Sequence, residues 1–151
     1  MSNEVELKLA VTPDAFDILK THLNQFNILE QNTIFLGNTY FDYPDHFLAK
    51  QKIGLRVRRE NNDFTLTLKT DGKVVGGLHS RPEYNLSIPD DSVPTSAQLT
   101  SLYPFEHLPS STLQPIFSTD FNRTFWLIAF GASKIEVAFD QGKILSGEKI
   151  Q

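Results

Sequence analysis

Charged and apolar side chains alternate with period two in several short segments of this chain. The alternation is clearest in segments 4–9, 54–58, 64–69, 81–86 and 135–139. Successive side chains of a β-strand point to opposite faces, so each segment predicts a strand with one charged or polar face and one apolar face. We therefore expect an α+β fold that is mainly antiparallel β, with a few peripheral helices.

Composition narrows the class of protein further. The chain has 151 residues, 40% of them hydrophobic and 21% charged, which is typical of a single globular domain. It has no cysteine, which excludes thiol chemistry and sulfur-ligated metals. The formal net charge of -4 argues against general binding of nucleic acid or anionic membranes. No leader pattern or long apolar run is visible, and we expect a cytoplasmic protein without membrane contact.

Cap and turn residues divide the chain into elements. Thr12 as N-cap and Pro13 at the first helical position predict an amphipathic helix of about 13 residues. Pro82 cannot donate to a ladder, so a sheet edge or bulge is expected there. Residues 140–142 are expected to turn between two strands. The other expected elements are strands at 4–11, 33–43, 54–60, 64–70, 81–88, 116–130, 134–139 and 143–145, and helical segments at 45–50 and 96–102.

Two arrangements are compatible with the polar strand faces. In the simpler one, an antiparallel sheet packs its apolar face on the core and leaves its charges in water. In the other, the sheet closes into a barrel whose charged face lines a tunnel, and the helix carrying Phe16, Leu19 and Leu23 covers the outside. An acidic pair on one strand and an arginine pair on another favour the barrel.

The two pairs have complementary chemistry. Glu4 and Glu6 lie two residues apart, so their Cα atoms are about 6.5 to 7 Å apart on one strand face. Carboxylates so placed suit Mg²⁺ or Mn²⁺, although such a pair is also common on an exposed surface. Arg56 and Arg58 can hold phosphate oxygens bidentately. Further cations come from Lys8, Lys69 and Arg123.

Other classes of site find no support in the sequence. The four histidines are scattered without metal-ligand spacing, and neither a P-loop nor a dinucleotide-binding glycine pattern is present. The many phenylalanines fall largely on strand faces opposite the charges, where packing explains them better than base stacking.

The motifs together resemble the CYTH superfamily, the triphosphate tunnel metalloenzymes, and the stretch 76–85 is most similar to its bacterial inorganic triphosphatase branch. The resemblance begins with the Glu-x-Glu-x-Lys signature at residues 4–8 and covers nearly the whole chain. The matching segments are Glu4-Val-Glu-Leu-Lys8, Tyr40-Phe-Asp-Tyr-Pro-Asp45, Gly54-Leu-Arg-Val-Arg58, Thr65-Leu-Thr-Leu-Lys69, 76–85, Phe117-Ser-Thr-Asp-Phe-Asn-Arg123 and Ile135-Glu-Val-Ala-Phe-Asp140.

The resemblance implies an eight-stranded antiparallel barrel whose charged lumen binds a linear triphosphate. A water oriented by the metal would attack the terminal phosphorus in line, without a protein nucleophile; Lys8 is the one side chain considered for a catalytic role. Carried over by position, the metal would be held by Glu4 and Glu6, with Glu136 and Asp140 as further candidates and Glu83 as a lumen residue of unassigned role. Phosphate would be held by Lys8, Arg56, Arg58, Lys69, Arg81 and Arg123.

Family members continue beyond the region matching residues 148–151 with a strand of alternating glutamates and a basic helix. We therefore expect residues 1–151 to be a single CYTH domain truncated at its C-terminus, which leaves open whether this chain is itself active. An open sheet edge would favour a homodimer. A helical CHAD domain often follows in this branch, so it is expected in the parent protein.

Several activities share such a tunnel. Metal-dependent hydrolysis of inorganic triphosphate leads. The alternatives are class IV adenylyl cyclase activity on a nucleoside triphosphate, hydrolysis of thiamine triphosphate, and a polyphosphate-binding module that turns over nothing. The sequence does not show room for a nucleoside or thiazole beside the phosphates.

Overall fold

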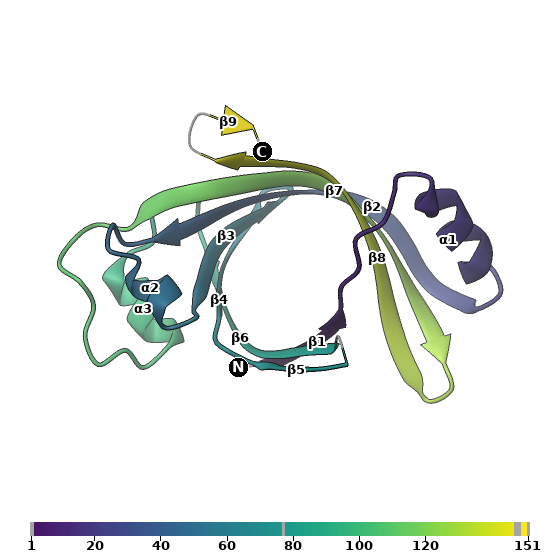
Figure 1. The fold of residues 1–151 in the computed structure, drawn as a ribbon, viewed down its shortest axis with the longest axis horizontal. Helices are drawn as coiled ribbons and strands as arrows, with labels where there is room; N and C mark the ends of the chain where they lie inside the picture. The colour runs from purple at the N-terminus through teal and green to yellow at the C-terminus, as the bar shows by residue number, and fades with distance from the viewer. Residues whose placement is uncertain (1, 77, 147–148, 151) are drawn as a thin grey trace.

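The computed structural model describes residues 2–76, 78–146 and 149–150, and the side chains of residues 5–76 and 78–145. Its described part is one antiparallel sheet with three helices (Figure 1). In chain order the elements are β1 (Ser2–Leu7), α1 (Ala15–Leu23), β2 (Asn27–Asp42), α2 (Phe47–Lys50), β3 (Gly54–Glu60), β4 (Asp63–Lys69), β5 (Lys73–Val75), β6 (Leu78–Ile88), α3 (Ser96–Leu102), β7 (Gln114–Phe130), β8 (Ser133–Ser146) and β9 (Lys149–Ile150).

The sheet curves strongly and forms a half-barrel (Figure 1), so of the two arrangements compatible with the alternation the curved one is found. Its strand order is β1-β6-β4-β3-β2-β7-β8-β9, and β5 pairs with the first three residues of β6. Over the described residues, β1 forms no ladder with β8 or β9, so hydrogen bonding does not close the curve into a complete cylinder. The mainly antiparallel fold is confirmed.

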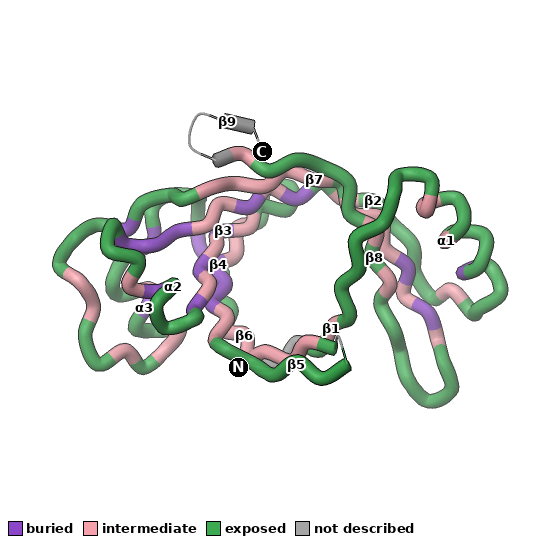
Figure 2. Tube along the Cα trace, in the orientation of Figure 1, coloured by how far each residue is buried: buried purple, intermediate pink, exposed green. Residues whose placement is uncertain are grey.

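The apolar strand faces pack outward, under the helices. One cluster of buried residues lies beneath α2 and α3 and includes Leu55, Leu66 and Leu99. A second, smaller cluster joins Trp126 and Ile128 to α1. Figure 2 shows buried stretches on both sides of the curve and a mostly intermediate lining between them. The opposite faces of these strands therefore form a polar concave surface, which we call the inner face.

Side-chain hydrogen bonds stabilise the starts of two helices, α2 and α3. The Asp42 carboxylate, at the end of β2, accepts hydrogen bonds from the backbone N–H groups of Tyr43, Leu48 and Ala49 at 2.7–3.0 Å. It therefore satisfies donors at the start of α2. Burial, followed by the negative charge of Asp42, raises the pKa of the Tyr43 phenol. In α3, Thr95 and Gln98 form a reciprocal capping box.

The first helix is shorter than predicted. It begins at Ala15 with Asp14 as N-cap, so the assignment of the N-cap to Thr12 was wrong. The Thr12 hydroxyl, which was expected to cap the helix, instead donates a hydrogen bond to the Asp14 carboxylate. Phe26 falls outside the helix and meets Phe130 at the tip of the β7–β8 hairpin. The predicted turn at 45–50 and helix at 96–102 are confirmed.

The predicted turn at residues 140–142 was also wrong, because β8 runs without interruption from Ser133 to Ser146. Gly142 lies inside the ladder opposite Phe121, where a Cβ would stand 2.1 Å from the Asp120 carbonyl oxygen. This glycine therefore allows a close backbone approach and does not make a turn. The unbroken register leaves Glu136 and Asp140 on the same face of β8.

Pro82 lies within β6, where it pairs with Asn3 of β1. The irregularity expected there is found on the other side of β6. Lys69 pairs with Glu83 and Lys73 with Ser80, so the neighbouring strand has one extra residue between β4 and β5. The proline thus coincides with a bulge in its partner, as the missing N–H requires.

Candidate functional site: the cationic inner face

Strand parity places the predicted cations on the inner face. In β3, Leu55 and Val57 are buried in the outer cluster, so Arg56 and Arg58 point the other way. The antiparallel registers put Arg58 beside Asn38 of β2 and Thr65 of β4. Basic side chains from different strands therefore meet across the concave surface.

Arg56 and Arg58 form the most polar part of this surface. The Nε of Arg56 is buried and has no hydrogen-bond partner. The Nε of Arg58 donates to Asn38 Oδ1 at 2.7 Å, and Asn38 Nδ2 donates to Thr119 Oγ1 at 3.2 Å. Asn38 is 1% exposed, so this contact fixes Arg58 against a rigid partner. A buried donor without an acceptor is costly unless an anion fills the space beside it.

The pKa of Arg58 also indicates that a bound anion would stabilise this region. Burial and then the positive charges of Arg56 and Arg123 lower the pKa of Arg58 from the ordinary value of an arginine to about 10. A guanidinium crowded by like charges is stabilised by any ligand that brings negative charge. Positive charge is therefore in excess around Arg58, as expected of a site for a polyanion.

Arg123 reaches the same region from β7 and has a carboxylate partner. Its Nε and Nη2 donate to the two oxygens of Asp140 at 2.8 and 2.9 Å, a bidentate pair between neighbouring strands. These hydrogen bonds are the main cause that raises the pKa of Arg123, with further contributions from Glu136 and Glu6. Asp140, predicted as a metal candidate, is thus engaged by an arginine predicted to bind phosphate.

Lys69 and Glu83 extend the polar surface to β4 and β6. Their side chains lie 3.9 Å apart and are 17% and 18% exposed. Glu83 also accepts from Asn85 Nδ2 at 2.9 Å, and the Thr67 hydroxyl donates to Asn85 Oδ1 at 2.7 Å. The carboxylate of Glu83 therefore orients a lysine and an amide on the inner face.

Arg81 is placed differently from the other predicted phosphate ligands. Its Nε donates to the carbonyl of Thr70 at 3.0 Å, and its Nη2 lies 3.5 Å from the carbonyl of Lys69. The same guanidinium lies over Gly54, at the start of β3. Gly54 lies four residue steps along β3 from Arg58, about 13 Å, so Arg81 lies apart from Arg58 at the end of the inner face.

The first strand, β1, pairs with β6 and places Glu4 and Glu6 next to Arg81 and His79 in the ladder. Glu4 pairs with Arg81 in the β1–β6 register, while its side chain lies outside the described set. Glu6 pairs with His79, and its carboxylate is 3.7 Å from Lys8 Nζ. Lys8 follows the end of β1 and is 78% exposed, so the structure does not bring it among the arginines.

The sequence missed the neutral side chains that position the arginines. Asn38 and Thr119 lie in aromatic-rich segments without charged alternation, so no pattern marked them. Their signal is the strand register alone, which places Asn38 between Arg58 of β3 and Thr119 of β7.

A model of the CYTH domain matches residues 2–151. The chain belongs to the CYTH family. Its known relatives include an inorganic triphosphatase of Haemophilus influenzae, which is 68% identical over 148 residues. That match covers 98% of this chain and 42% of the relative, so the chain spans about two fifths of the relative's length.

Solved structures of low sequence identity share the fold of this CYTH chain. The PH1819 protein of Pyrococcus horikoshii has a TM-score of 0.62 at 17% identity, with 98% of this chain and 79% of that one covered. A putative adenylyl cyclase from Hippeastrum, described as having a dominant triphosphatase activity, has a TM-score of 0.52 at 16% identity, covering 91% and 77%. These likenesses support the half-barrel architecture.

CYTH triphosphatases are metal-dependent in general, so the fit of this chain to a cation matters. Among residues with described side chains, no group of three or more Asp, Glu, His or Cys could hold a metal ion. Asp140 is bound by Arg123, and Glu6 is partly exposed beside Lys8. The described side chains alone therefore do not form a complete ligand set.

Proposed function

We propose that this CYTH domain binds inorganic triphosphate on its inner face and hydrolyses it to pyrophosphate and phosphate. The observation that carries the proposal is the convergence of Arg56, Arg58 and Arg123 around a buried guanidinium nitrogen that has no acceptor. The 68% identical relative, named an inorganic triphosphatase, supports the choice of substrate.

The residues act by binding and by neutralising charge. The guanidinium groups of Arg56 and Arg58 take phosphate oxygens, and Asn38 and Asp140 hold Arg58 and Arg123 in orientation. With its charge neutralised, the terminal phosphorus accepts a water oxygen while the bridging P–O bond breaks and pyrophosphate leaves. Positioning and charge stabilisation are the main demands of such a reaction, so no covalent intermediate is required.

The identity of the metal and its ligands stays a prediction. Mg²⁺ or Mn²⁺ is proposed because both prefer carboxylate oxygens. The proposed ligands are Glu4, Glu6, Glu136 and Asp140. The influence of Glu6 and Glu136 on the pKa of Arg123 supports their facing the same space, although the described side chains do not complete a site.

One observation favours a second candidate, a binding module without turnover. The inner face supplies cations for a polyanion, whereas the described residues supply no three-ligand metal group. Such a module would hold a triphosphate or longer phosphate chain and hydrolyse neither.

Phosphate release measured from triphosphate, ATP and thiamine triphosphate, with and without Mn²⁺, separates these functions when calorimetric binding is measured in parallel. Metal-dependent release from triphosphate supports the hydrolase, and tight binding without release supports the module. Cyclic AMP with pyrophosphate from ATP would indicate a cyclase. Because the chain matches only part of its relative, a longer chain containing these residues is assayed beside it.

A matched pair of variants tests the site itself. Arg56→Ala removes a guanidinium from the inner face. Arg59→Ala removes a guanidinium from the same strand, β3, that lies over the ring of Phe64 in β4. We expect triphosphate binding to fall at least tenfold in Arg56→Ala and to change less than threefold in Arg59→Ala. Equal losses would show that general charge, and not the inner face, attracts the ligand.

The localisation, partners and domain context of the protein are also proposals. Among the described residues, no helix is long and apolar enough to cross a membrane. We propose a cytoplasmic protein whose partner is triphosphate or a nucleoside triphosphate, with no nucleic acid or membrane partner. A homodimer through the open edge, a CHAD domain in the parent protein and the assignment of residues 1–151 to one domain are also proposals.

A further inference from the structure

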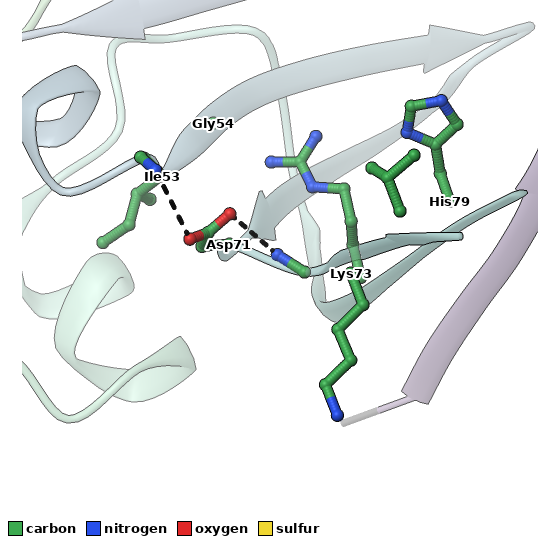
Figure 3. Close-up of a pocket in the computed structure, with 9 residues that line it drawn as sticks. Ile53, Gly54, Asp71, Lys73 and His79 are labelled. Carbon is green, nitrogen blue, oxygen red and sulfur yellow. Dashed lines mark hydrogen bonds and ion pairs between the residues drawn. The ribbon is translucent and has the colours of Figure 1, made fainter. Parts of the chain in front are cut away.

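A second basic pocket lies at the end of the inner face, beyond Lys69. It has a volume of about 390 Å³, and its walls include Lys52, Gly54, Asp71, Lys73, His79 and Arg81. In Figure 3, Ile53 and Gly54 stand on one side of this pocket and His79 on the other. We call it the rim pocket.

The register explains why the pocket forms here. Gly54 is the first residue of β3 and pairs with Lys69, the last residue of β4. Beyond this point β5 and β6 continue as a hairpin without β3 beside them. Gly54 has no side chain, so the guanidinium of Arg81 lies over it and is fixed by the carbonyls of Thr70 and Lys69.

Charge in the rim pocket favours an anion. Among the lining residues whose side chains the structure describes, Lys52, Lys73 and Arg81 bring three positive charges, against the one carboxylate of Asp71. Asp71 lies 3.9 Å from Lys52, but both side chains are largely exposed, so this pair neutralises little of the pocket's field. The walls are also unsuited to a nucleoside, because His79 is the only aromatic side chain among the lining residues.

The rim pocket continues a line of cations along the inner face. Arg58, Arg56 and Gly54 follow one another at every second position of β3, about 6.6 Å apart, and Arg81 occupies the place above Gly54. A linear anion lying against Arg58 and Arg56 would therefore meet Arg81 next if it were long enough. This geometry suits a chain of repeated charges better than a compact anion.

We propose that the rim pocket is a second anion subsite, which holds phosphate groups beyond those bound by Arg56 and Arg58, so that linear polyphosphates longer than triphosphate bind here. The inference rests on the proposed function, because it takes the inner face as the site of a triphosphate unit. Lys52, Lys73 and Arg81 then determine the length of chain that is bound most tightly.

The test compares triphosphate with a linear hexaphosphate by calorimetry at low salt. The double variant Lys52→Asn, Lys73→Gln removes both pocket lysines. Asn is chosen because Lys52 has a positive φ of 58°, which Asn tolerates. Lys20→Gln with Lys134→Gln, both exposed and outside the pocket lining, makes the same change in net charge.

We expect the pocket variant to bind hexaphosphate at least tenfold more weakly than the unsubstituted chain does, with its triphosphate affinity within twofold. In the control variant, the affinities for both ligands should change less than twofold. A longer chain gains affinity simply by offering more registers, but that gain is the same in every variant. Parent-like hexaphosphate binding by a folded pocket variant would overturn the subsite while leaving triphosphate binding intact. Failure of the parent chain to bind triphosphate would instead overturn the proposed function.

Discussion

Replacing Arg56 by Met should stabilise the fold while it removes ligand binding. Arg56 carries a buried Nε without an acceptor and is the charged neighbour that contributes most to lowering the pKa of Arg58. Met fills a similar volume, so the substitution removes a charge and an unsatisfied donor without creating a large cavity. Function and stability are thus expected to oppose each other at this position.

The expected magnitude follows from the pKa of Arg58. The fall of this pKa from its ordinary value to about 10 corresponds to about 3 kcal/mol against the charged form in the folded chain. Burial causes the larger part, and solvent screens the rest, so relieving the repulsion and the unmet donor together should add about 1 to 2 kcal/mol to the free energy of unfolding. In a domain of this size that raises Tm by about 2 to 8 °C.

The pH of the experiment follows from the sign of the shift. Because the folded state lowers the pKa of Arg58, the unfolded chain binds more protons between pH 10 and 12.5, and stability from this group rises with pH only there. Below about pH 10 the destabilisation is present in full. Melting at pH 7.5 therefore measures all of it.

The assay is thermal and urea unfolding at low salt, with and without triphosphate. Arg59→Met is the control, because it lies on the same strand and its Nε donates to the Asn61 carbonyl at 3.0 Å. We expect it to be neutral or slightly destabilising. Saturating triphosphate at 100 times its Kd should add about 2.7 kcal/mol to the parent chain and little to Arg56→Met. An Arg56→Met chain less stable than Arg59→Met would refute the reasoning.

Three further substitutions test other parts of the structure. Asp42→Ala leaves three backbone donors without their acceptor and should lower the free energy of unfolding by about 3 kcal/mol in urea melts, whereas a loss below 1 kcal/mol would contradict the capping role. Asp140→Asn breaks a partly exposed pair, so stability should change by less than about 1 kcal/mol while KM for triphosphate rises several-fold; unchanged KM would exclude a positioning role for Asp140. Glu6→Gln should abolish metal-dependent turnover with an unaltered circular dichroism spectrum, and full activity would remove Glu6 from the proposed ligands.

Alternation predicted much of the fold because each strand has one face against an apolar cluster. The parity of Arg56 and Arg58 follows from the burial of Leu55 and Val57 alone. The family resemblance then identified the charged face as an inner face, which alternation by itself left open. The first step uses only residues next to each position, whereas the second uses motifs along nearly the whole chain.

Local sequence patterns did not predict the features that depend on contacts between residues far apart in the sequence. The segment 140–142 has the sequence of a turn, yet Gly142 stays in the ladder. A side chain there would clash with the backbone of Asp120 and Phe121 in β7. The pairing of Arg123 with Asp140, and the position of Arg81 over Gly54, depend on which strands are neighbours. The orientation of Arg56 and Arg58 toward the inner face could be predicted from the sequence, but the partner of each charge required the strand register.

The separation of the two hydrophobic clusters bears on how the chain unfolds. β2 contributes Phe41 to the α2–α3 cluster and packs Ile28 against the α1 cluster, whereas β7 contributes Trp126 and Ile128 to the α1 cluster, and the two clusters share no residue. Cooperativity between the two ends must pass along backbone ladders and not through a shared interior. Amide hydrogen exchange should then be faster in α1 and the adjoining β7–β8 tip than in β3 and β4, and a uniform exchange rate would mean that the ends melt as one unit.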